Sequence, residues 1–157
     1  MRVAILTVSD SVSSGVSQDR SGPSVAERCR ELGWEIASCS VLADDRTAIE
    51  NFLKNTADSK SVDLILTTGG TGLGPRDVTP EATMEVAERL IPGFSERMRA
   101  EGAKQTTRAL LSRAAAGIRG QTMIVNLPGS PRGAVESLDT IAGLLEHAVA
   151  VVHGARH

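Results

Sequence analysis

The stretch VDLILTTGGTGLGPRD, residues 62–77, combines the two features that decide how this 157-residue chain folds. Its first part, Val62 to Thr67, is short and largely apolar, which is typical of a strand buried on both faces of a parallel sheet. Its second part, Thr68 to Pro75, is the most glycine-dense segment of the chain. A buried strand that ends in such a loop predicts an α/β sheet with a ligand site beyond the carboxyl ends of its strands.

Three further segments predict the rest of the sheet. Val3 to Val8 is a nearly continuous apolar run, and Gln121 to Leu127 is another strand that ends in a Pro-Gly-Ser turn. Glu35 to Leu42 alternates enough between apolar and polar residues to predict a strand as well.

Helices are predicted between these strands. A polar loop from Ser11 to Ser21 leads into the first of them, which Ser21 caps and Gly33 ends. Thr47 and Glu50 fit a capping box that opens the second.

Thr79 is expected to cap the next helix, with Pro80 at its first position and Val86, Ala87 and Leu90 on one face. Two more helical segments are predicted near residues 94–102 and 106–116.

The C-terminal segment predicts a long amphipathic helix that Ser130 caps and Pro131 begins. Apolar residues recur along it at steps of three and four: Val135, Leu138, Ala142, Leu145, Val149 and Val152. Strands that alternate with helices predict one α/β domain over residues 1–157, a three-layer α/β/α fold with a mostly parallel central sheet and helices on both faces. The pattern leaves the strand order open.

Composition narrows the classes of partner. Aromatic residues make up 2% of the chain and the formal net charge is −2, so we expect no nucleic-acid partner. Cys29 and Cys39 are too few for a zinc site and are expected to be reduced and mostly buried, with a disulfide as the alternative. The N-terminal apolar run is too short to span a membrane, so we expect no membrane association and a cytoplasmic protein.

Polar residues follow four of the predicted strands, and the carboxyl ends of parallel strands meet at one edge of a sheet. The candidates, in chain order, are Ser9 and Asp10; Asp44 and Asp45; Thr68, Gly69, Gly70, Thr71, Gly72, Arg76 and Asp77; and Asn126, Pro128, Gly129 and Ser130. Asp10, Asp44, Gly70, Asp77 and Ser130 are predicted to converge on one pocket. Ser112, Arg113 and Arg119 are further candidates to reach a phosphate, with an exposed helix position as the alternative.

The glycine-rich loop has a direct physical use. Without Cβ atoms, Gly69 to Gly72 would let backbone N–H groups approach a phosphate, and Thr68 and Thr71 add hydroxyl donors. The loop is neither a GxxxxGK[ST] P-loop nor a GxGxxG dinucleotide turn. A turn with only a structural role is the alternative, but the adjacent Arg76 and Asp77 favour a site.

Asp44 and Asp77 raise the question of charge. A carboxylate beside a polyphosphate is repelled by about 4 kcal/mol for unit charges about 4 Å apart at an effective dielectric near 20. A cation, a proton or a hydroxyl group of the substrate would remove this repulsion. Mg²⁺ fits best, because it is a hard ion that links one or two carboxylates to substrate phosphates. The pair therefore predicts a Mg²⁺ site, without showing which aspartate holds the ion. The alternative is that each residue only polarises a turn or a helix start.

Seven segments, in order, resemble the molybdenum-cofactor biosynthesis family that includes the molybdopterin adenylyltransferases. They are LTVSDS (6–11), DRSGP (19–23), LADD (42–45), LTTGGTGLGPRDVTPEAT (66–83), PGFSERMR (92–99), LLSRAAAGIRG (110–120) and VNLPGSPRGAVE (125–136). The resemblance spans nearly the whole chain, and TTGGTG-x-x-x-RDVTPEAT is its most specific motif.

The resemblance implies a homotrimeric α/β/α domain that binds molybdopterin and Mg-ATP. Such enzymes transfer AMP to the terminal phosphate of molybdopterin and release pyrophosphate. The family's two functional aspartates fall on Asp44 and Asp77, its nucleotide loop on Gly69 to Gly72, and its pterin-side serines on Ser112 and Ser130. A transient contact with the molybdenum-insertase protein is also implied.

Each candidate is thereby assigned to one of the two substrates. Ser9, Asp10, Thr68 to Gly72 and Pro128 to Ser130 are assigned to the nucleotide and its phosphates, and Ser112 and Arg113 to the pterin. Ser130 has both assignments, since the resemblance also makes it a pterin-side serine. Two alternatives to this enzyme remain. One is a carrier of the same fold that binds molybdopterin without reacting, and the other is an unrelated phosphate-binding hydrolase, for which the sequence offers no evident base.

Overall fold

The computed structural model describes residues 1–156, and His157 lies outside the described part. The strands are β1 (Arg2–Val8), β2 (Glu35–Leu42), β3 (Leu64–Thr68), β4 (Arg89–Leu90), β5 (Ala116–Arg119) and β6 (Thr122–Leu127). The helices are α1 (Asp10–Ser13), α2 (Ser21–Glu31), α3 (Arg46–Asp58), α4 (Thr79–Val86), α5 (Pro92–Ala103) and α6 (Pro131–Val152), with a 3-10 turn, η1 (Thr107–Leu111).

The strands form one sheet in the order β2-β1-β3-β6-β5-β4. β2, β1, β3 and β6 are parallel, whereas β5 is antiparallel to both β6 and β4. The predicted mostly parallel sheet is therefore confirmed. β2 and β3 lie on opposite sides of β1, so the chain changes direction at β1. Open α/β sheets bind ligands at the carboxyl ends of the strands where the connections diverge in this way.

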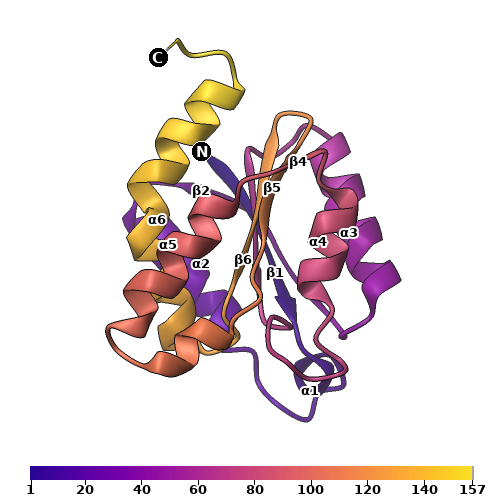
Figure 1. Ribbon diagram of the computed structural model, residues 1–157. Coiled ribbons are helices and arrows are strands. Elements are labelled where there is room, and N and C mark those ends of the chain that lie inside the picture. Colours follow the sequence, from indigo (N-terminus) through magenta and orange to yellow (C-terminus); the bar gives the residue numbers. More distant parts are fainter. Residues whose placement is uncertain (157) are drawn as a thin grey trace.

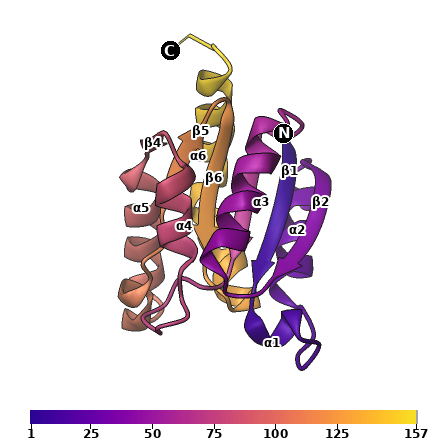
Figure 2. The same cartoon turned by 90° about the vertical axis from the view of Figure 1, so that its right-hand side faces the viewer.

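Helices cover both faces of the sheet, as the three-layer prediction requires. α2, α5 and α6 lie on one face and α3 and α4 on the other, and Figure 2 views the sheet from the α3 side. Strand residues alternate between the two cores: Ile5 and Leu66 pack toward α2 and α6, while Leu6 and Ile65 pack toward α3 and α4. Burial on both faces explains why these strands have nearly continuous apolar sequences.

Three of the predicted helix starts are wrong by one or two residues. Asp19, not Ser21, accepts the Gly22 N–H at the start of α2, and Asp45, not Thr47, caps α3. Thr79 is the first residue of α4 rather than its cap. For α2 and α3, neighbouring Ser, Thr and Asp residues are all acceptable, so the tertiary structure decides which of them accepts the N–H group. For α4, the residue before Thr79 is Val78, which has no side-chain acceptor.

The cap predicted for α6 is confirmed, because Ser130 Oγ accepts the Gly133 N–H at 3.1 Å. The stripe along this helix is confirmed from Leu138 onward, with Leu138, Leu145 and Val149 buried against the sheet. At its start the prediction is wrong by one residue, because Ala134 rather than Val135 is part of the core.

The prediction of a helix over 106–116 is wrong. This segment forms η1 and then runs into β5, which pairs with both β6 and β4. α4 also ends earlier than expected, at Val86, so Leu90 lies exposed in β4 rather than on the helix. The predicted loop after Ser11 instead begins within α1. The predicted helix over 106–116 is wrong because a short apolar run such as 114–118 has no periodicity that distinguishes a strand from a helix.

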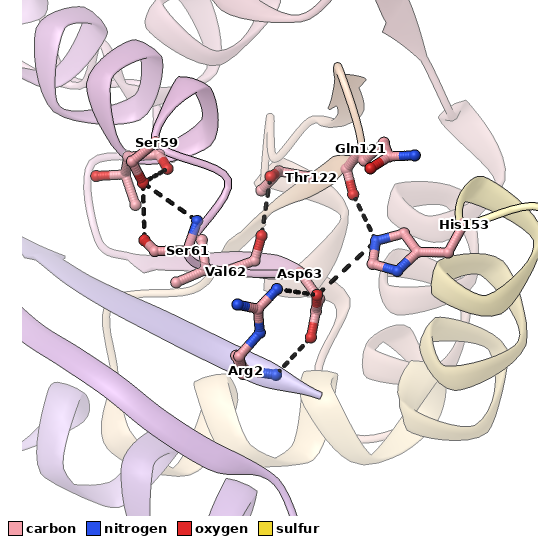
Figure 3. Close-up of polar contacts among 9 residues, drawn as sticks. Arg2, Ser59, Ser61, Val62, Asp63, Gln121, Thr122 and His153 are labelled. Atoms are coloured by element: carbon pink, nitrogen blue, oxygen red, sulfur yellow. Dashed lines mark hydrogen bonds and ion pairs between the residues drawn. The ribbon is translucent and has the colours of Figure 1, made fainter.

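The amino edge of the sheet, opposite to α1, is tied together by polar contacts. Asp63 accepts hydrogen bonds from the Arg2 backbone N–H at 2.7 Å and from the Arg2 guanidinium at 3.0 Å (Figure 3). His153, at the end of α6, lies 3.0 Å from the Gln121 carbonyl and 3.8 Å from Asp63. These contacts join β1, β3 and the C-terminal helix at the edge away from the candidate site.

Both cysteines are free thiols, so the expected reduced state is confirmed. Cys29 is buried, and burial raises the pKa of its thiol to about 12. Cys39 lies exposed on the edge strand β2, contrary to the expectation that both are mostly buried. Among residues 1–156, no helix has both the length and the apolar character needed to cross a membrane.

Candidate active site

The carboxyl ends of β1, β2, β3 and β6 meet at the edge of the sheet that carries α1, at the bottom of Figure 1. β1 leads into Ser9 and Asp10, β2 into Asp44, and β3 into the glycine-rich loop. α2 and α6 begin at the same edge, and helix N-termini favour negatively charged ligands.

The loop after β3 requires glycine for two separate reasons. Gly69 and Gly70 have φ of +99° and +67°, which L-residues rarely adopt. A Cβ on Gly69 would also collide with the Val8 carbonyl, because the loop crosses directly over the end of β1. The first reason is visible in the sequence only as a run of glycines, and the second depends on the packing of the strands.

The loop is fastened to the turn that follows β6. Thr68 Oγ1 donates to the Pro128 carbonyl at 2.6 Å, and the Gly69 N–H donates to the Leu127 carbonyl at 3.2 Å. A Cβ on Gly129 would lie 3.3 Å from Gly69 Cα, so the two turns touch through their glycines. The hydroxyl of Thr68 is therefore used within the protein.

Three charged side chains lie beside the loop. Arg76 donates to both carboxylate oxygens of Asp10, at 3.0 and 2.9 Å. Asp10 in turn accepts the Asp44 N–H at 3.0 Å, and the Asp10 N–H donates to Asp44 Oδ2 at 3.0 Å. The hydrogen bonds from Arg76, followed by the one from Asp44, hold the pKa of Asp10 below its ordinary value.

Asp44 differs from Asp10 in its electrostatics. Partial burial raises the pKa of Asp44; the Asp10 N–H opposes this rise, and the nearby carboxylates of Asp10 and Asp77 add to it. The ionised form of Asp44 is thus incompletely compensated by the protein. This environment fits a carboxylate that is completed by a cation.

Asp77 forms a tight turn with Gly74 at the end of the loop. Its Oδ2 accepts the Gly74 N–H at 2.9 Å, and its own N–H donates to the Gly74 carbonyl at 3.0 Å. A Cβ on Gly72 would lie 2.9 Å from the same carboxylate oxygen. Asp77 therefore shapes the loop besides facing the space in front of it.

Two hollows flank the glycine-rich loop. The first, of about 410 Å³, is here called the nucleotide hollow, after the ligand that the family resemblance implies for its residues. The predicted site residues that line it are Ser9, Asp44, Thr68, Gly69, Gly70, Asp77 and Gly129. The second, of about 500 Å³, lies between the loop, α5, η1 and α6 and is here called the helical hollow. The predicted site residues that line it are Thr71, Gly72, Ser112, Pro128 and Ser130.

Asp44, Gly70 and Asp77 thus converge on one hollow, as the sequence predicts, but two of the five residues named for that pocket do not line it. Asp10 lies behind Asp44 and braces it, and Ser130 lines the adjoining helical hollow. The single predicted pocket is in fact two hollows separated by the loop.

Arg113 takes a different position from the one expected of a ligand contact. Its guanidinium donates to the Gly72 and Asp77 carbonyls, each at 2.8 Å, and pairs with Glu81. Its backbone N–H donates to the Thr71 carbonyl at 2.9 Å. Arg113 therefore clamps the second half of the glycine-rich loop, from Thr71 to Asp77, to α4.

Two other candidates also serve the protein itself. Asn126 is buried, and its amide group bonds Thr67, Thr83 and the Ala115 N–H. Arg119 pairs with Asp58 on the far end of α3.

Several lining residues were not identified from the sequence. Asp19 and Arg20 line the nucleotide hollow, and Arg99 and Gln105 line the helical hollow. Arg20 and Arg99 lie within segments that carry the family resemblance, which was the only available signal for them.

The donor set bears on which metal the site suits. No group of three or more His, Cys, Asp or Glu within residues 1–156 is arranged to hold a metal ion by itself. Asp44 and Asp77 line the same hollow, and their mutual repulsion contributes to the raised pKa of Asp44. Two carboxylates with no soft or nitrogen ligand fit Mg²⁺, which takes its remaining ligands from water and phosphates.

The family pattern described as "Probable molybdopterin binding domain" matches residues 4–147. The molybdopterin adenylyltransferase of Helicobacter pylori J99 is 38% identical over 156 residues, which is 98% of this chain and 89% of that protein. The Escherichia coli K12 protein of the same name is 39% identical, over 98% of this chain and 79% of that protein.

Solved structures agree with these sequence matches. The molybdopterin biosynthesis enzyme MoaB of Thermus thermophilus superposes with a TM-score of 0.92 at 47% identity, covering 98% of this chain and 97% of that one. The Mycobacterium ulcerans Mog protein superposes with a TM-score of 0.89 at 38% identity, covering 96% and 97% of the two chains. The pattern match covers most of the chain and includes the whole glycine-rich loop. This protein therefore belongs to the probable molybdopterin binding domain family.

Proposed function

We propose that this protein is a molybdopterin adenylyltransferase, which transfers AMP from ATP to the terminal phosphate of molybdopterin and releases pyrophosphate. One observation carries the proposal: Asp44 and Asp77 line the same hollow on one side of the glycine-rich loop, and a second hollow lies on the other side of that loop. Relatives of 38–39% identity bear the same name over nearly the full chain.

Each hollow suits one substrate. The nucleotide hollow has the carboxylate pair, Arg20 and the start of α2, which match a polyphosphate with its cation. The helical hollow is lined by Ser112 and Ser130 together with Met98 and Leu111, a mixture of apolar walls and hydroxyls that suits a heterocycle. The loop between them would bring the phosphate of one substrate beside the phosphates of the other.

The reaction needs little base catalysis. The attacking group, a phosphate monoester dianion, is already a nucleophile near neutral pH, and the barrier is the approach of one anion to another. Backbone N–H groups of Gly70 to Gly72 would hold phosphate oxygens, and Ser112 and Ser130 would orient the pterin phosphate. Positioning and charge neutralisation then supply the rate acceleration.

Asp44 and Asp77 would hold Mg²⁺ directly or through water. The chemistry that the ion supplies when bound is neutralisation of the negative charge on the polyphosphate. Asp10 keeps Asp44 in place, and Arg76 in turn holds Asp10, so that the carboxylate does not turn away from the hollow.

We further propose a homotrimer that acts in the cytoplasm, where ATP is available, and that contacts the molybdenum-insertase protein transiently. Exposed leucines on η1 and α6, Leu110, Leu111 and Leu144, support an association surface. Light scattering at micromolar concentration tests the assembly, and a monomer would contradict it.

A turnover assay tests the activity. The protein is incubated with molybdopterin, ATP and Mg²⁺, and pyrophosphate and adenylyl-molybdopterin are quantified, with Asp44→Asn as the inactive control. We expect stoichiometric formation of both products. Binding of molybdopterin without any turnover would favour the carrier instead, and hydrolysis of ATP without transfer would favour a hydrolase.

A further inference from the structure

Thr79 has a polar atom whose role no contact within the described residues explains. The residue is 0% exposed at the start of α4, and its Oγ1 has no hydrogen-bond partner there. A buried hydroxyl without a partner lowers the stability of the folded state, because it gives up hydrogen bonds to water. Valine has nearly the same shape and would avoid that cost, so the hydroxyl calls for a functional reason.

The hydroxyl lies directly beneath the glycine-rich loop. The Thr79 N–H donates to the Gly70 carbonyl at 3.1 Å, and Oγ1 approaches Gly70 so closely that a Cβ at that position would collide with it. The same Cβ position lies 3.0 Å from Asp44 Oδ1. The hydroxyl and the carboxylate therefore both border the space that the absent side chain of Gly70 leaves open.

Asp44 has a carboxylate oxygen that could accept a hydrogen bond from this hydroxyl. Its Oδ2 accepts the Asp10 N–H, whereas no hydrogen bond to its Oδ1 occurs among the described residues. A donor on the Oδ1 side would prevent the carboxylate from rotating about its Cβ–Cγ bond. Thr79 Oγ1 and Asp44 Oδ1 border the same space at Gly70, so the contact would require the hydroxyl to turn toward Asp44 across that space. Hydrogen bonds to a charged acceptor are the stronger kind, which would favour that arrangement.

We propose that Thr79 is a positioning residue for Asp44: its hydroxyl donates to Asp44 Oδ1 below Gly70 and fixes the carboxylate toward the nucleotide hollow. The inference rests on the proposed function, because it assigns Asp44 the task of holding the cation of the polyphosphate. Asp10 holds one carboxylate oxygen and Thr79 the other, and each oxygen keeps a lone pair for the substrate side. Gly70 is required because any side chain there would separate donor from acceptor.

Thr83, one turn later on α4, provides a matched control. It is also 0% exposed, but its Oγ1 accepts from Asn126 Nδ2 at 2.8 Å, so its hydroxyl has a structural partner. Loss of the hydroxyl at 83 should therefore reduce stability alone, whereas loss at 79 should affect the site.

The test compares Thr79→Val, Thr79→Ser and Thr83→Val in three measurements. The first is adenylylation: Thr79→Val should lower kcat about tenfold or more while KM for molybdopterin stays within about twofold, and Thr79→Ser should recover most of kcat. The second is Mn²⁺ affinity with a non-hydrolysable ATP analogue, followed by electron paramagnetic resonance. It should fall about tenfold in Thr79→Val only. Thr83→Val should lower Tm and leave kcat and Mn²⁺ affinity within about twofold.

The third measurement is a crystal structure of the wild-type protein with Mn²⁺ and the analogue, in which Thr79 Oγ1 should lie within about 3.2 Å of Asp44 Oδ1. A Thr79→Val protein with wild-type kcat and Mn²⁺ affinity overturns the proposal, as does a Thr79→Ser protein no better than Thr79→Val. A wild-type protein without turnover would reject the proposed function instead. The distance and the Mn²⁺ measurement would still decide the role of Thr79.

Discussion

Asp10 and Asp44 hold each other by a reciprocal pair of hydrogen bonds, each from the backbone N–H of one residue to the carboxylate of the other and each 3.0 Å long. The two residues follow β1 and β2, so the pair ties together the carboxyl ends of neighbouring parallel strands. Arg76, from the loop after β3, neutralises Asp10 and leaves Asp44 as the carboxylate whose charge is least compensated. The arrangement distinguishes Asp10, which braces its neighbour, from Asp44, which faces the hollow.

Replacing Asp44 with asparagine should lower the adenylylation rate at least about 100-fold, or about 2.7 kcal/mol of transition-state stabilisation. The charge that would hold the cation is lost, while the shape of the side chain is kept. Affinity for molybdopterin without nucleotide should change much less. Asp45→Asn is the matched control, since asparagine caps helices as well as aspartate and Asp45 only caps α3. An Asp44→Asn protein that keeps more than half the rate would contradict the role assigned to it.

Gly70→Ala should weaken binding of Mg-ATP about tenfold or more and should also reduce stability. Alanine is strained at a φ of +67°, and its Cβ would collide with Thr79. Gly15→Ala isolates the first effect, because Gly15 has a φ of +81° with no atom within 4 Å of a new Cβ. We expect Gly15→Ala to cost about 1 kcal/mol and to leave ATP affinity unchanged, as measured by urea unfolding and calorimetry. Equal ATP affinities of the two variants would refute the close-packing argument.

Arg113→Gln should raise KM for ATP about tenfold with a smaller effect on kcat, because the glycine-rich loop loses its attachment to α4. Limited proteolysis should cleave the segment 71–77 faster in this variant. Lysine should not rescue it, since one ammonium cannot reach the Gly72 and Asp77 carbonyls and Glu81 together. Arg132→Gln is the control, as Arg132 is exposed on α6 and pairs only with Glu136 among the described residues. Direct ligand contact by Arg113 would instead appear as a loss of molybdopterin affinity with an intact loop.

Asp63 should make stability depend on pH in the acid range. Burial disfavours its ionised form, but the hydrogen bonds from the Arg2 side chain and backbone outweigh burial and hold the pKa of Asp63 below its ordinary value. A lowered folded-state pKa means that the stabilisation is complete above the unfolded value of about 3.9 and is lost as pH falls through the folded value.

Asp63→Asn should therefore lower the free energy of unfolding by about 1 kcal/mol at pH 7, by weakening the bonds from the Arg2 guanidinium and backbone N–H. The difference from wild type should shrink below about pH 4, and urea unfolding at a series of pH values measures it. Asp58→Asn serves as the control, because Asp58 is exposed and its pair with Arg119 should contribute little. A difference that stays constant down to about pH 2 would show that the charge of Asp63 is not involved.

The sequence alone determined the elements whose signal is local. The apolar runs of β1, β3 and β6 and the stripe on α6 reflect burial along one segment, so periodicity and length are enough to identify them. The glycine-rich loop and the two aspartates after β2 and β3 were likewise found in place, because parallel strands bring their carboxyl ends to one edge.

The tertiary structure alone decided the features that depend on distant partners. Residues 116–119 became a strand because β6 and β4 offered edges to pair with, and Asp45 rather than Thr47 became a cap because the path of the chain set where α3 starts. Arg113 was directed to loop carbonyls far from it in sequence. The space shared by Thr79, Gly70 and Asp44 exists only because three segments converge there. Hydrogen-bond partners and voids belong to pairs of segments, and no pattern within one segment encodes them.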